Sequence, residues 1–290
     1  MQITPIAGAL GADITGIDLA RPVNDELFKA VHGALVRYGV IVIRDQSLTP
    51  RQQLAFVERF GPIHFHPHVS GIPDLPQVME ILKTEQDTTN FGAGWQTDQS
   101  FLPAPAMATC LYALELPDAG GDTLFACMRN GYRTLSPGLR KLALGLRTMN
   151  QSVAAQLARG GGQNAATYSS MRTRNAESDE PPAEHPLVRE HPVSGEPALY
   201  LGLHTQSFAR FNVAESQPLI EQFMAHLTRP ENTCRVRWTP GALALWDNRS
   251  VLHNAINDYP GKRRRMHRIT VAGDSPIAFV EDRANQGDVR

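Results

Sequence analysis

Two short segments of this 290-residue chain carry side chains that could hold a metal ion. The first is Gly94-Trp95-Gln96-Thr97-Asp98-Gln99-Ser100-Phe101, and the second is Trp246-Asp247-Asn248-Arg249, followed by His253. On an extended segment, residues two apart point the same way, so positions 96 and 98 can present their side chains together. A neighbouring strand could bring His253 to the same place. An amide oxygen, a carboxylate and an imidazole would then face one ion.

Several arginines follow His253, in the run Arg263-Arg264-Arg265-Met266-His267-Arg268. A guanidinium group matches a carboxylate bidentately, so such a run can clamp a small organic acid. A surface basic patch is the alternative, and we favour it for Arg263 and Arg265. The other candidates have simpler explanations too, because an aspartate in a loop is usually a turn former. His64, His66 and His68 could likewise be the alternate positions of a solvated strand.

Together the two segments resemble the taurine dioxygenase family of iron(II)- and 2-oxoglutarate-dependent oxygenases. That family has an early Trp-His-x-Asp segment and a later Trp-Asp-Asn-Arg…His segment followed by arginines. Two more landmarks match in the right order, Gly-Ala-Asp-Ile-Thr-Gly-Ile-Asp-Leu at 11–19 and Gly120-Gly121-Asp122-Thr123. The resemblance reaches to about Pro276 and so covers nearly the whole chain. Four ordered landmarks are much more specific than a single His-x-Asp motif.

The resemblance implies a catalytic centre in which Asp98 and His253 bind Fe(II), with 2-oxoglutarate as cosubstrate and O2 as oxidant. It also implies that Arg264 pairs with the distal carboxylate of 2-oxoglutarate and that Thr123 adds a hydrogen bond to it. The implied reaction hydroxylates a small anion-bearing organic substrate: a sulfonate, a sulfate ester or a carboxylic acid. Succinate and CO2 are the implied co-products.

The resemblance also suggests which residues hold the substrate. Arg268 occupies the position where the family holds an anionic substrate group, and His66 resembles its substrate-contacting histidine. Val69 and Gly92 stand where polar substrate-binding residues are expected, which argues against taurine itself and favours a bulkier or more apolar acid. His204 has even odds of being a pocket residue or a structural one.

Gln96 departs from the family pattern, which has a metal-binding histidine at this position. Gln96 could coordinate iron through its amide oxygen, a weaker ligand, and give a weakened oxygenase or an altered outcome such as desaturation or epimerisation. Another histidine, His66 or His204, could complete the set instead. The chain could also be a non-catalytic protein that binds 2-oxoglutarate or a small acid. We favour retained oxygenase chemistry, because the complete cosubstrate clamp is still present.

The elements that must position these residues follow from capping and periodicity. Helices are predicted over Asn24–Tyr38, Ser136–Leu144 and Glu215–Leu227, and another from Thr49 to near Gly61. Strands are predicted over Val40–Ile43, Cys234–Trp238, Ala242–Trp246 and Arg268–Val271. Many strands with a few helices predict a mainly β protein with flanking helices, and the resemblance implies a double-stranded β-helix, the cupin-like jelly roll. We expect one domain over residues 1–290, with a mobile insertion at 151–186 for which we favour a lid over a spare linker.

Composition excludes several classes of protein. The net charge is −1, so no basic field suggests nucleic acid or an anionic membrane as partner. The three cysteines lack a CxxC spacing, which argues against a disulfide framework and a zinc site. Neither a signal peptide nor an apolar run of about 18 residues is present. We therefore expect a cytoplasmic protein, a homo-oligomer, whose partner is a small anionic molecule.

Overall fold

Alternating apolar residues build a large sheet that runs through the middle of the structure, a computed structural model that describes residues 1–66, 69–152 and 181–281. Its strand order is β1-β2-β3-β14-β6-β16-β4, and β5 also pairs with β16. The strands are β1 (Gln2–Pro5), β2 (Ala12–Thr15), β3 (Val40–Ile43), β4 (Ile63–His64), β5 (Met79–Lys83), β6 (Ala108–Glu115), β14 (Leu243–Asp247) and β16 (Arg264–Val271). Most neighbours are antiparallel, and only β2 and β3 pair in parallel.

A small sheet packs against the inner face of the large one. It contains β7 (Thr123–Cys127) between β13 (Thr233–Val236) and β15 (Val251–Ala255). Side chains alternate along each strand, so every second residue points into the space between the sheets. The two inner faces share one apolar core, with Leu111 and Trp246 from the large sheet and Phe125 and Val251 from the small one. This sandwich is the predicted mainly β jelly-roll core, and its inner face is where the polar residues of interest lie.

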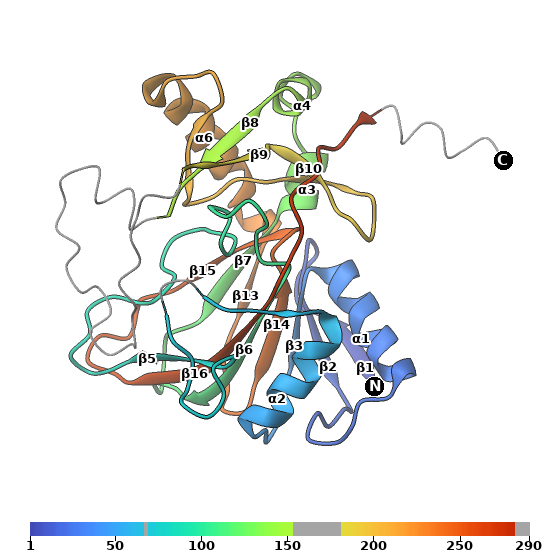
Figure 1. The fold of residues 1–290 in the computed structure, drawn as a ribbon, viewed down its shortest axis with the longest axis vertical. Coiled ribbons are helices and arrows are strands. Elements are labelled where there is room, and N and C mark those ends of the chain that lie inside the picture. The colour runs from blue at the N-terminus through green and yellow to red at the C-terminus, as the bar shows by residue number, and fades with distance from the viewer. Residues whose placement is uncertain (67–68, 153–180, 282–290) are drawn as a thin grey trace.

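Two helices cover the outer face of the large sheet, α1 (Asp25–Tyr38) and α2 (Pro50–Val57), and a short 3-10 turn, η1 (Glu58–Phe60), follows α2 (Figure 1). Asn24 caps α1 by accepting from the Leu27 amide, and Gly39 ends it at φ 73°. Thr49 and Gln52 form both halves of a capping box at the start of α2. Both helices were predicted from these same signals.

A third layer lies beyond the small sheet, at the top of Figure 1. It contains the helices α3 (Met128–Arg133), α4 (Pro137–Leu144) and α6 (Val213–Leu227), the 3-10 turn η2 (Pro230–Asn232) and two small sheets. Those sheets hold β8 (Arg147–Asn150), β9 (Ala183–Pro186) and β12 (Thr205–Phe208), and β10 (Val188–Glu190) with β11 (Pro197–Leu199). Their shared core includes Tyr200, Phe208 and Phe223, and reaches Leu252 on β15.

The predicted boundaries differ from the observed ones at a few points. Helix α6 begins at Val213 rather than Glu215, because Asn212 and Glu215 form a capping box. Strand β13 ends at Val236, two residues before Trp238, and strand β16 begins four residues earlier than predicted, at Arg264. The six-residue helix α3 was not predicted. Most of the proposed lid, residues 153–180, lies outside the described residues.

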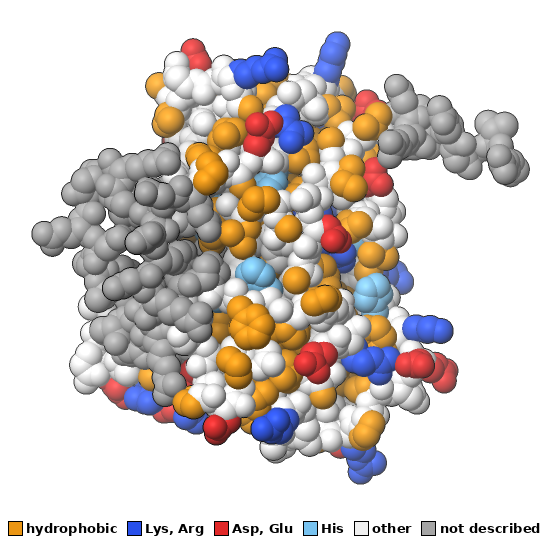
Figure 2. All heavy atoms as spheres, in the orientation of Figure 1, with side chains coloured by type: hydrophobic (Ala, Val, Ile, Leu, Met, Phe, Trp, Pro, Cys, Tyr) orange, Lys and Arg blue, Asp and Glu red, His pale blue; other side chains and the backbone are white. Residues whose placement is uncertain are grey.

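Charge on the surface is mixed rather than concentrated. On the face drawn in Figure 2, acidic and basic side chains are interspersed, and neither sign forms a continuous field. Within the described part of the chain, no helix is both long and apolar enough to cross a membrane. The mixed surface charge agrees with the near-zero net charge of the sequence.

Candidate metal and cosubstrate site

His253 and Gln96 are held side by side by their backbones. The Gln96 amide donates to the His253 carbonyl oxygen at 2.9 Å, and the His253 amide donates to the Gln96 carbonyl oxygen at 2.8 Å. Two residues that exchange both hydrogen bonds lie directly opposite each other, so their side chains share one face. That face is the interior, where His253 is 5% exposed and Gln96 is 7% exposed. The bridge therefore brings together two segments more than 150 residues apart.

Asp98 reaches the same place through a turn rather than through an extended strand. Gln96 forms the bridge to His253, a turn begins at Asp98, and Gln99 follows with a positive φ of 58°. The predicted i, i+2 alternation is therefore not what positions the carboxylate. The Asp98 Oδ1 atom nevertheless lies 3.6 Å from His253 Nε2. Two donor atoms bound to one metal at about 2.0–2.2 Å each are separated by about 3–4 Å, so this pair has the spacing of two ligands.

Both oxygens of the Asp98 carboxylate have partners. Arg268 Nη2 donates to Oδ1 at 2.7 Å, and the Thr109 hydroxyl donates to Oδ2 at 2.6 Å. Burial alone would raise the pKa of Asp98, but the neighbouring charges of Arg268 and His253 and these hydrogen bonds hold it well below its usual range. Burial lowers the pKa of His253, despite the nearby Asp98 charge. The pair is thus an ionised carboxylate next to a neutral imidazole, the protonation states that metal ligands require.

The backbone bridge places Gln96 opposite His253, and the Gln96 side chain lies near Gly92. A Cβ atom added to Gly92 would lie 3.0 Å from Gln96 Nε2, so the glycine at position 92 leaves room for this amide. Gly92 has φ 77°, a conformation that favours glycine. Within the described residues, no third histidine, cysteine or carboxylate joins Asp98 and His253 in a metal-binding group. Among the described residues the structure thus brings no further histidine to this pair, and Gln96 stays the candidate for the third donor.

His204 instead belongs to a hydrogen-bonded structure behind the site. Its Nδ1 atom lies 3.0 Å from the Ser100 hydroxyl, and its ring packs edge-on against Phe101. Burial lowers the pKa of His204 to about 4, so the ring is neutral near pH 7. Of the two interpretations open from the sequence, these contacts favour the structural one.

Arg264 and Thr123 face each other across the interior, one from each sheet. They line one cavity together with His253, Arg268, Phe91 and Trp246. Arg264 is 6% exposed, and its Nε and Nη2 atoms have no hydrogen-bond partner among the described residues. Thr123 Oγ1 accepts from Trp238 Nε1 at 3.0 Å, which leaves its own hydroxyl hydrogen available. Buried donors without acceptors are rare in proteins, so this end of the cavity suits an anion.

Lys83 adds a second buried cation at this end, and nothing in the sequence singled it out. It is 5% exposed and lies directly opposite Arg264 in the β5–β16 pairing. Its Nζ atom lies 4.4 Å from the centre of the Tyr259 ring and 3.4 Å from the Tyr259 carbonyl oxygen. The only local signal for such a residue is that burial alternates along its β-strand. This alternation alone does not distinguish a buried lysine from one at the surface.

His66 and Arg268 both lie close to the Phe91 ring. The His66 ring centre is 5.9 Å from that of Phe91, and the Arg268 guanidinium carbon is 5.8 Å from the same ring. Arg268 is 5% exposed and lines the cavity, and its guanidinium pairs with Asp98 in this structure. The structure thus brings both predicted substrate residues to Phe91, which lines the same cavity as His253.

The Trp-Asp-Asn-Arg landmark supports the site from behind. The Asp247 carboxylate is fully buried, pairs with Arg249 through both of its oxygens and accepts from His191 Nε2 at 2.9 Å. This network ties the turn before β15 to the hairpin between β10 and β11. Asp247 and Arg249 therefore stabilise the segment that carries His253 and do not themselves line the cavity.

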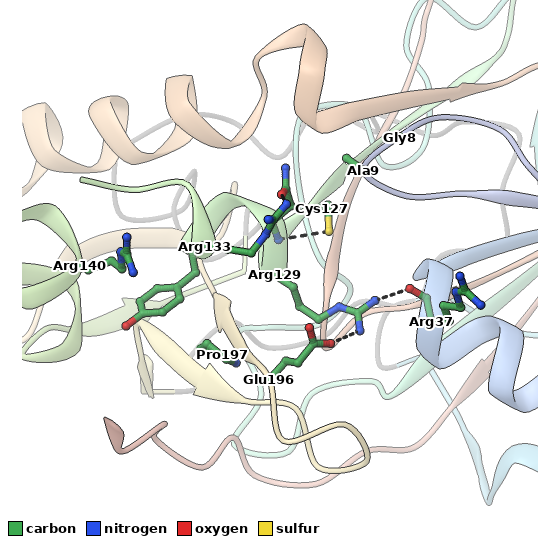
Figure 3. Close-up of a pocket in the computed structure, with 11 residues that line it drawn as sticks. Gly8, Ala9, Arg37, Cys127, Arg129, Arg133, Arg140, Glu196 and Pro197 are labelled. Atoms are coloured by element: carbon green, nitrogen blue, oxygen red, sulfur yellow. Dashed lines mark hydrogen bonds and ion pairs between the residues drawn. The ribbon is translucent and has the colours of Figure 1, made fainter. Parts of the chain in front are cut away.

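A wider cleft lies elsewhere, between the end of α1, helix α3 and the β10–β11 hairpin (Figure 3). Four arginines line it, Arg37, Arg129, Arg133 and Arg140, together with Glu196. Arg129 donates to Glu196 at 2.6 Å and to the Arg37 carbonyl oxygen at 2.9 Å. Its cation is already paired, and among the described residues that line the cleft none is a histidine and Glu196 is the only carboxylate.

Comparison with known proteins places the chain in a family. The family described as "Taurine catabolism dioxygenase TauD, TfdA family" matches residues 2–270. An alpha-ketoglutarate-dependent sulfate ester dioxygenase from Pseudomonas putida is 33% identical over 96% of this chain and 91% of its own length. An (S)-phenoxypropionate/alpha-ketoglutarate-dioxygenase from Sphingobium herbicidovorans is 31% identical, over 94% and 95% respectively. The chain belongs to the TauD/TfdA family, as the sequence landmarks predicted.

Solved structures agree with this assignment. A taurine dioxygenase from Burkholderia xenovorans matches with a TM-score of 0.77 at 31% identity, covering 96% of this chain and 92% of that one. The structure of AAD-2 in complex with Mn(II) and N-oxalylglycine matches with a TM-score of 0.79 at 26% identity, covering 96% and 100%. The named relatives are alpha-ketoglutarate-dependent dioxygenases, and this chain is an enzyme of the same class, an oxidoreductase with the jelly-roll core of the family.

Proposed function

We propose that this chain uses Fe(II), 2-oxoglutarate and O2 to hydroxylate a small anion-bearing organic substrate. The observation that carries the proposal is one buried cavity lined by His253, with Asp98 Oδ1 3.6 Å away, and by Arg264 with two free donors. Asp98, His253 and the Gln96 amide oxygen would hold the metal. Bound Fe(II) with 2-oxoglutarate and O2 supplies the oxidising power for C–H hydroxylation, with succinate and CO2 as co-products.

The residues of the chain act on the cosubstrate by binding and orienting it. The two free donors of Arg264 match the two oxygens of a distal carboxylate, and the free Thr123 hydroxyl hydrogen can donate to the same group. Lys83 adds positive charge next to Arg264. The other end of 2-oxoglutarate would then face Asp98 and His253, as two-point binding of a dianion requires.

Arg268 and His66 are our candidates for binding the substrate anion. The relatives' names specify a sulfate ester and a phenoxypropionate, each of which combines an anionic group with an apolar or aromatic part. Phe91, which lies close to both His66 and Arg268, offers an aromatic surface for that apolar part. A sulfate ester, a sulfonate or an aryloxy carboxylic acid therefore fits better than taurine, which has a charged amine at its other end.

The test is turnover against matched substrate panels. Purified protein is incubated with Fe(II), 2-oxoglutarate and O2, and succinate is measured with alkyl sulfates, alkyl sulfonates, aryloxy carboxylates and taurine. We expect substrate-dependent succinate from at least one of the first three classes and less from taurine. Absence of stimulated succinate formation from every class, under conditions where 2-oxoglutarate is bound, would contradict the oxygenase proposal.

Gln96 supports a second candidate function, a protein that binds 2-oxoglutarate or a small acid without turnover. An amide oxygen is a weaker ligand for iron than imidazole, while the cosubstrate end of the cavity does not depend on it. Calorimetric titration of 2-oxoglutarate into the metal-free protein separates the two functions. Binding that is equally tight with and without Fe(II), together with no turnover, would favour the binding protein.

A further inference from the structure

Asn248 is fixed in a single orientation next to the metal ligands. It is fully buried, its backbone amide donates to the Met107 carbonyl oxygen, and its carbonyl oxygen accepts from the Thr97 hydroxyl at 2.6 Å. Its side-chain Oδ1 lies 3.0 Å from Trp246 Nε1 and 3.3 Å from the Asp98 backbone amide. An indole N–H and a backbone N–H can only donate, so the atom between them must be the oxygen. The Nδ2 group of Asn248 therefore points the other way.

That orientation determines the direction of the next hydrogen bond. Asn248 Nδ2 lies 3.0 Å from Thr109 Oγ1, and a side-chain amide nitrogen can only donate. The Thr109 hydroxyl must accept this bond, and its single hydrogen goes to its other partner, Asp98 Oδ2, at 2.6 Å. Thr109 is fully buried on the inner face of β6, so water does not compete for that hydrogen.

We infer that Asn248 and Thr109 form a one-way relay that selects which oxygen of Asp98 binds the metal. The relay holds Oδ2 from behind, whereas Oδ1 faces His253 Nε2 at 3.6 Å. Oδ1 also accepts from Arg268 Nη2 at 2.7 Å, and its second lone pair is left for the metal. Both are positioning residues, since neither contacts the metal position. The inference rests on the proposed function, in that Asp98 is taken to be a metal ligand.

The relay has a chemical consequence beyond orientation. A charge-assisted hydrogen bond to Oδ2 keeps that oxygen from turning toward the metal, so Asp98 binds through one oxygen rather than two. Hydrogen-bond partners of this kind orient metal ligands, and removing one typically lowers metal affinity about 10–100-fold. With Gln96 as a weak third ligand, the geometry of Asp98 matters more to this site than to one with two histidines.

The test uses Mn(II) as the probe, because its free form has an electron paramagnetic resonance signal that binding removes. Thr109→Val keeps the shape and removes the hydroxyl, and Thr109→Ser restores the hydroxyl without the methyl group. We expect Thr109→Val to weaken Mn(II) binding about 10–100-fold and Thr109→Ser to stay close to the unmodified protein. Asn248→Asp, which removes the Nδ2 donor, is expected to weaken binding in the same direction. Equal Mn(II) affinity in the unmodified protein and Thr109→Val would overturn the relay.

Thermal unfolding and crystal structures separate this inference from a structural role and from the proposed function. A merely structural Thr109 would lower the melting temperature in Thr109→Val and leave Mn(II) affinity unchanged. If no variant and not even the unmodified protein binds Mn(II), the metal site of the proposed function fails. The relay is then decided by crystal structures: it predicts that Asp98 turns or adopts two conformers in Thr109→Val but not in Thr109→Ser. An unmoved Asp98 contradicts it.

Discussion

The cavity lined by Arg264 and His253 and the cleft lined by four arginines both contain guanidinium groups. The two regions differ in whether those groups have hydrogen-bond partners. In the cleft, Arg129 pairs with Glu196 and with a backbone carbonyl, and Arg37 and Arg133 are exposed to water (Figure 3). In the cavity, Arg264 is buried, and two of its nitrogen donors have no hydrogen-bond acceptor among the described residues. Burying charged donors without acceptors costs free energy, so such a residue indicates a site where a ligand supplies the acceptors. The arginine cleft is larger than the cavity, so size does not identify the site.

Among the substitutions that test this difference between cavity and cleft, replacing His253 is expected to have the largest effect. His253→Ala removes the imidazole that lies next to Asp98. We expect metal affinity to fall at least 100-fold, because loss of a supporting residue alone costs about 10–100-fold. Titration with Mn(II) or Fe(II) measures it. His226→Ala is the control. His226 lies on α6 and hydrogen-bonds to the Gly131 carbonyl oxygen, so its replacement should leave metal binding unchanged. Equal loss in both variants would point to unfolding rather than to a ligand.

Arg264→Met directly compares the cavity with the cleft. We expect affinity for 2-oxoglutarate to fall about 30-fold or more, because truncating one partner of a buried charge pair costs about 2–5 kcal/mol. Arg37→Met removes an exposed arginine of the cleft and should leave the affinity unchanged. Calorimetric titration compares the two variants. A larger loss in Arg37→Met would reverse our assignment of the two regions.

Gln96→His tests whether the side chain at position 96 contacts the metal. Imidazole is a better iron ligand than an amide oxygen, and the backbone bridge to His253 already points this side chain inward. We therefore expect Fe(II) affinity to rise about 10-fold or more, on the scale by which ligand changes alter such sites. Unchanged affinity would mean that position 96 does not contact the metal. Higher affinity with lost turnover would instead show that the amide is an adapted ligand.

Lys83→Met is the smallest of the expected effects. The substitution keeps the apolar stem and removes a cation that lies opposite Arg264 in the β5–β16 pairing and packs over the Tyr259 ring. An interaction of about 1 kcal/mol, lost from the cosubstrate end, corresponds to about a 5-fold rise in KM for 2-oxoglutarate. The KM for substrate should not change. A change in substrate KM alone would place Lys83 at the other end of the cavity.

The sequence predicted those features that depend on short-range signals. The N-cap residues Asn24, Thr49 and Ser136 act on amides three positions along the chain, so each helix start was visible in the local pattern. The landmarks also predicted the family and brought Asp98, His253, Thr123 and Arg264 into one site. That prediction came from resemblance, since nothing local indicates that two segments more than 150 residues apart share a backbone bridge.

The residues that support the site could not be predicted in the same way. Thr109 lies in the apolar strand β6, where a threonine is an ordinary β-former, and only the tertiary fold places it against Asp98. Asn248 was noticed as part of a landmark but without a role. Asp98 was expected on an extended segment, whereas the positive φ of Gln99 shows a turn that the pattern did not signal. The predicted lid stays a prediction.

The most direct test of the central claim is anaerobic titration of Fe(II) into the metal-free protein with saturating 2-oxoglutarate, followed by visible absorption. An iron(II) centre that binds a 2-oxo acid gives a coloured charge-transfer complex. The account predicts a band that saturates at one iron per chain, that is lost in His253→Ala, and that needs more 2-oxoglutarate to appear in Arg264→Met. The absence of a band, with no iron retained by the protein, would contradict the claim that these residues form one metal and cosubstrate site.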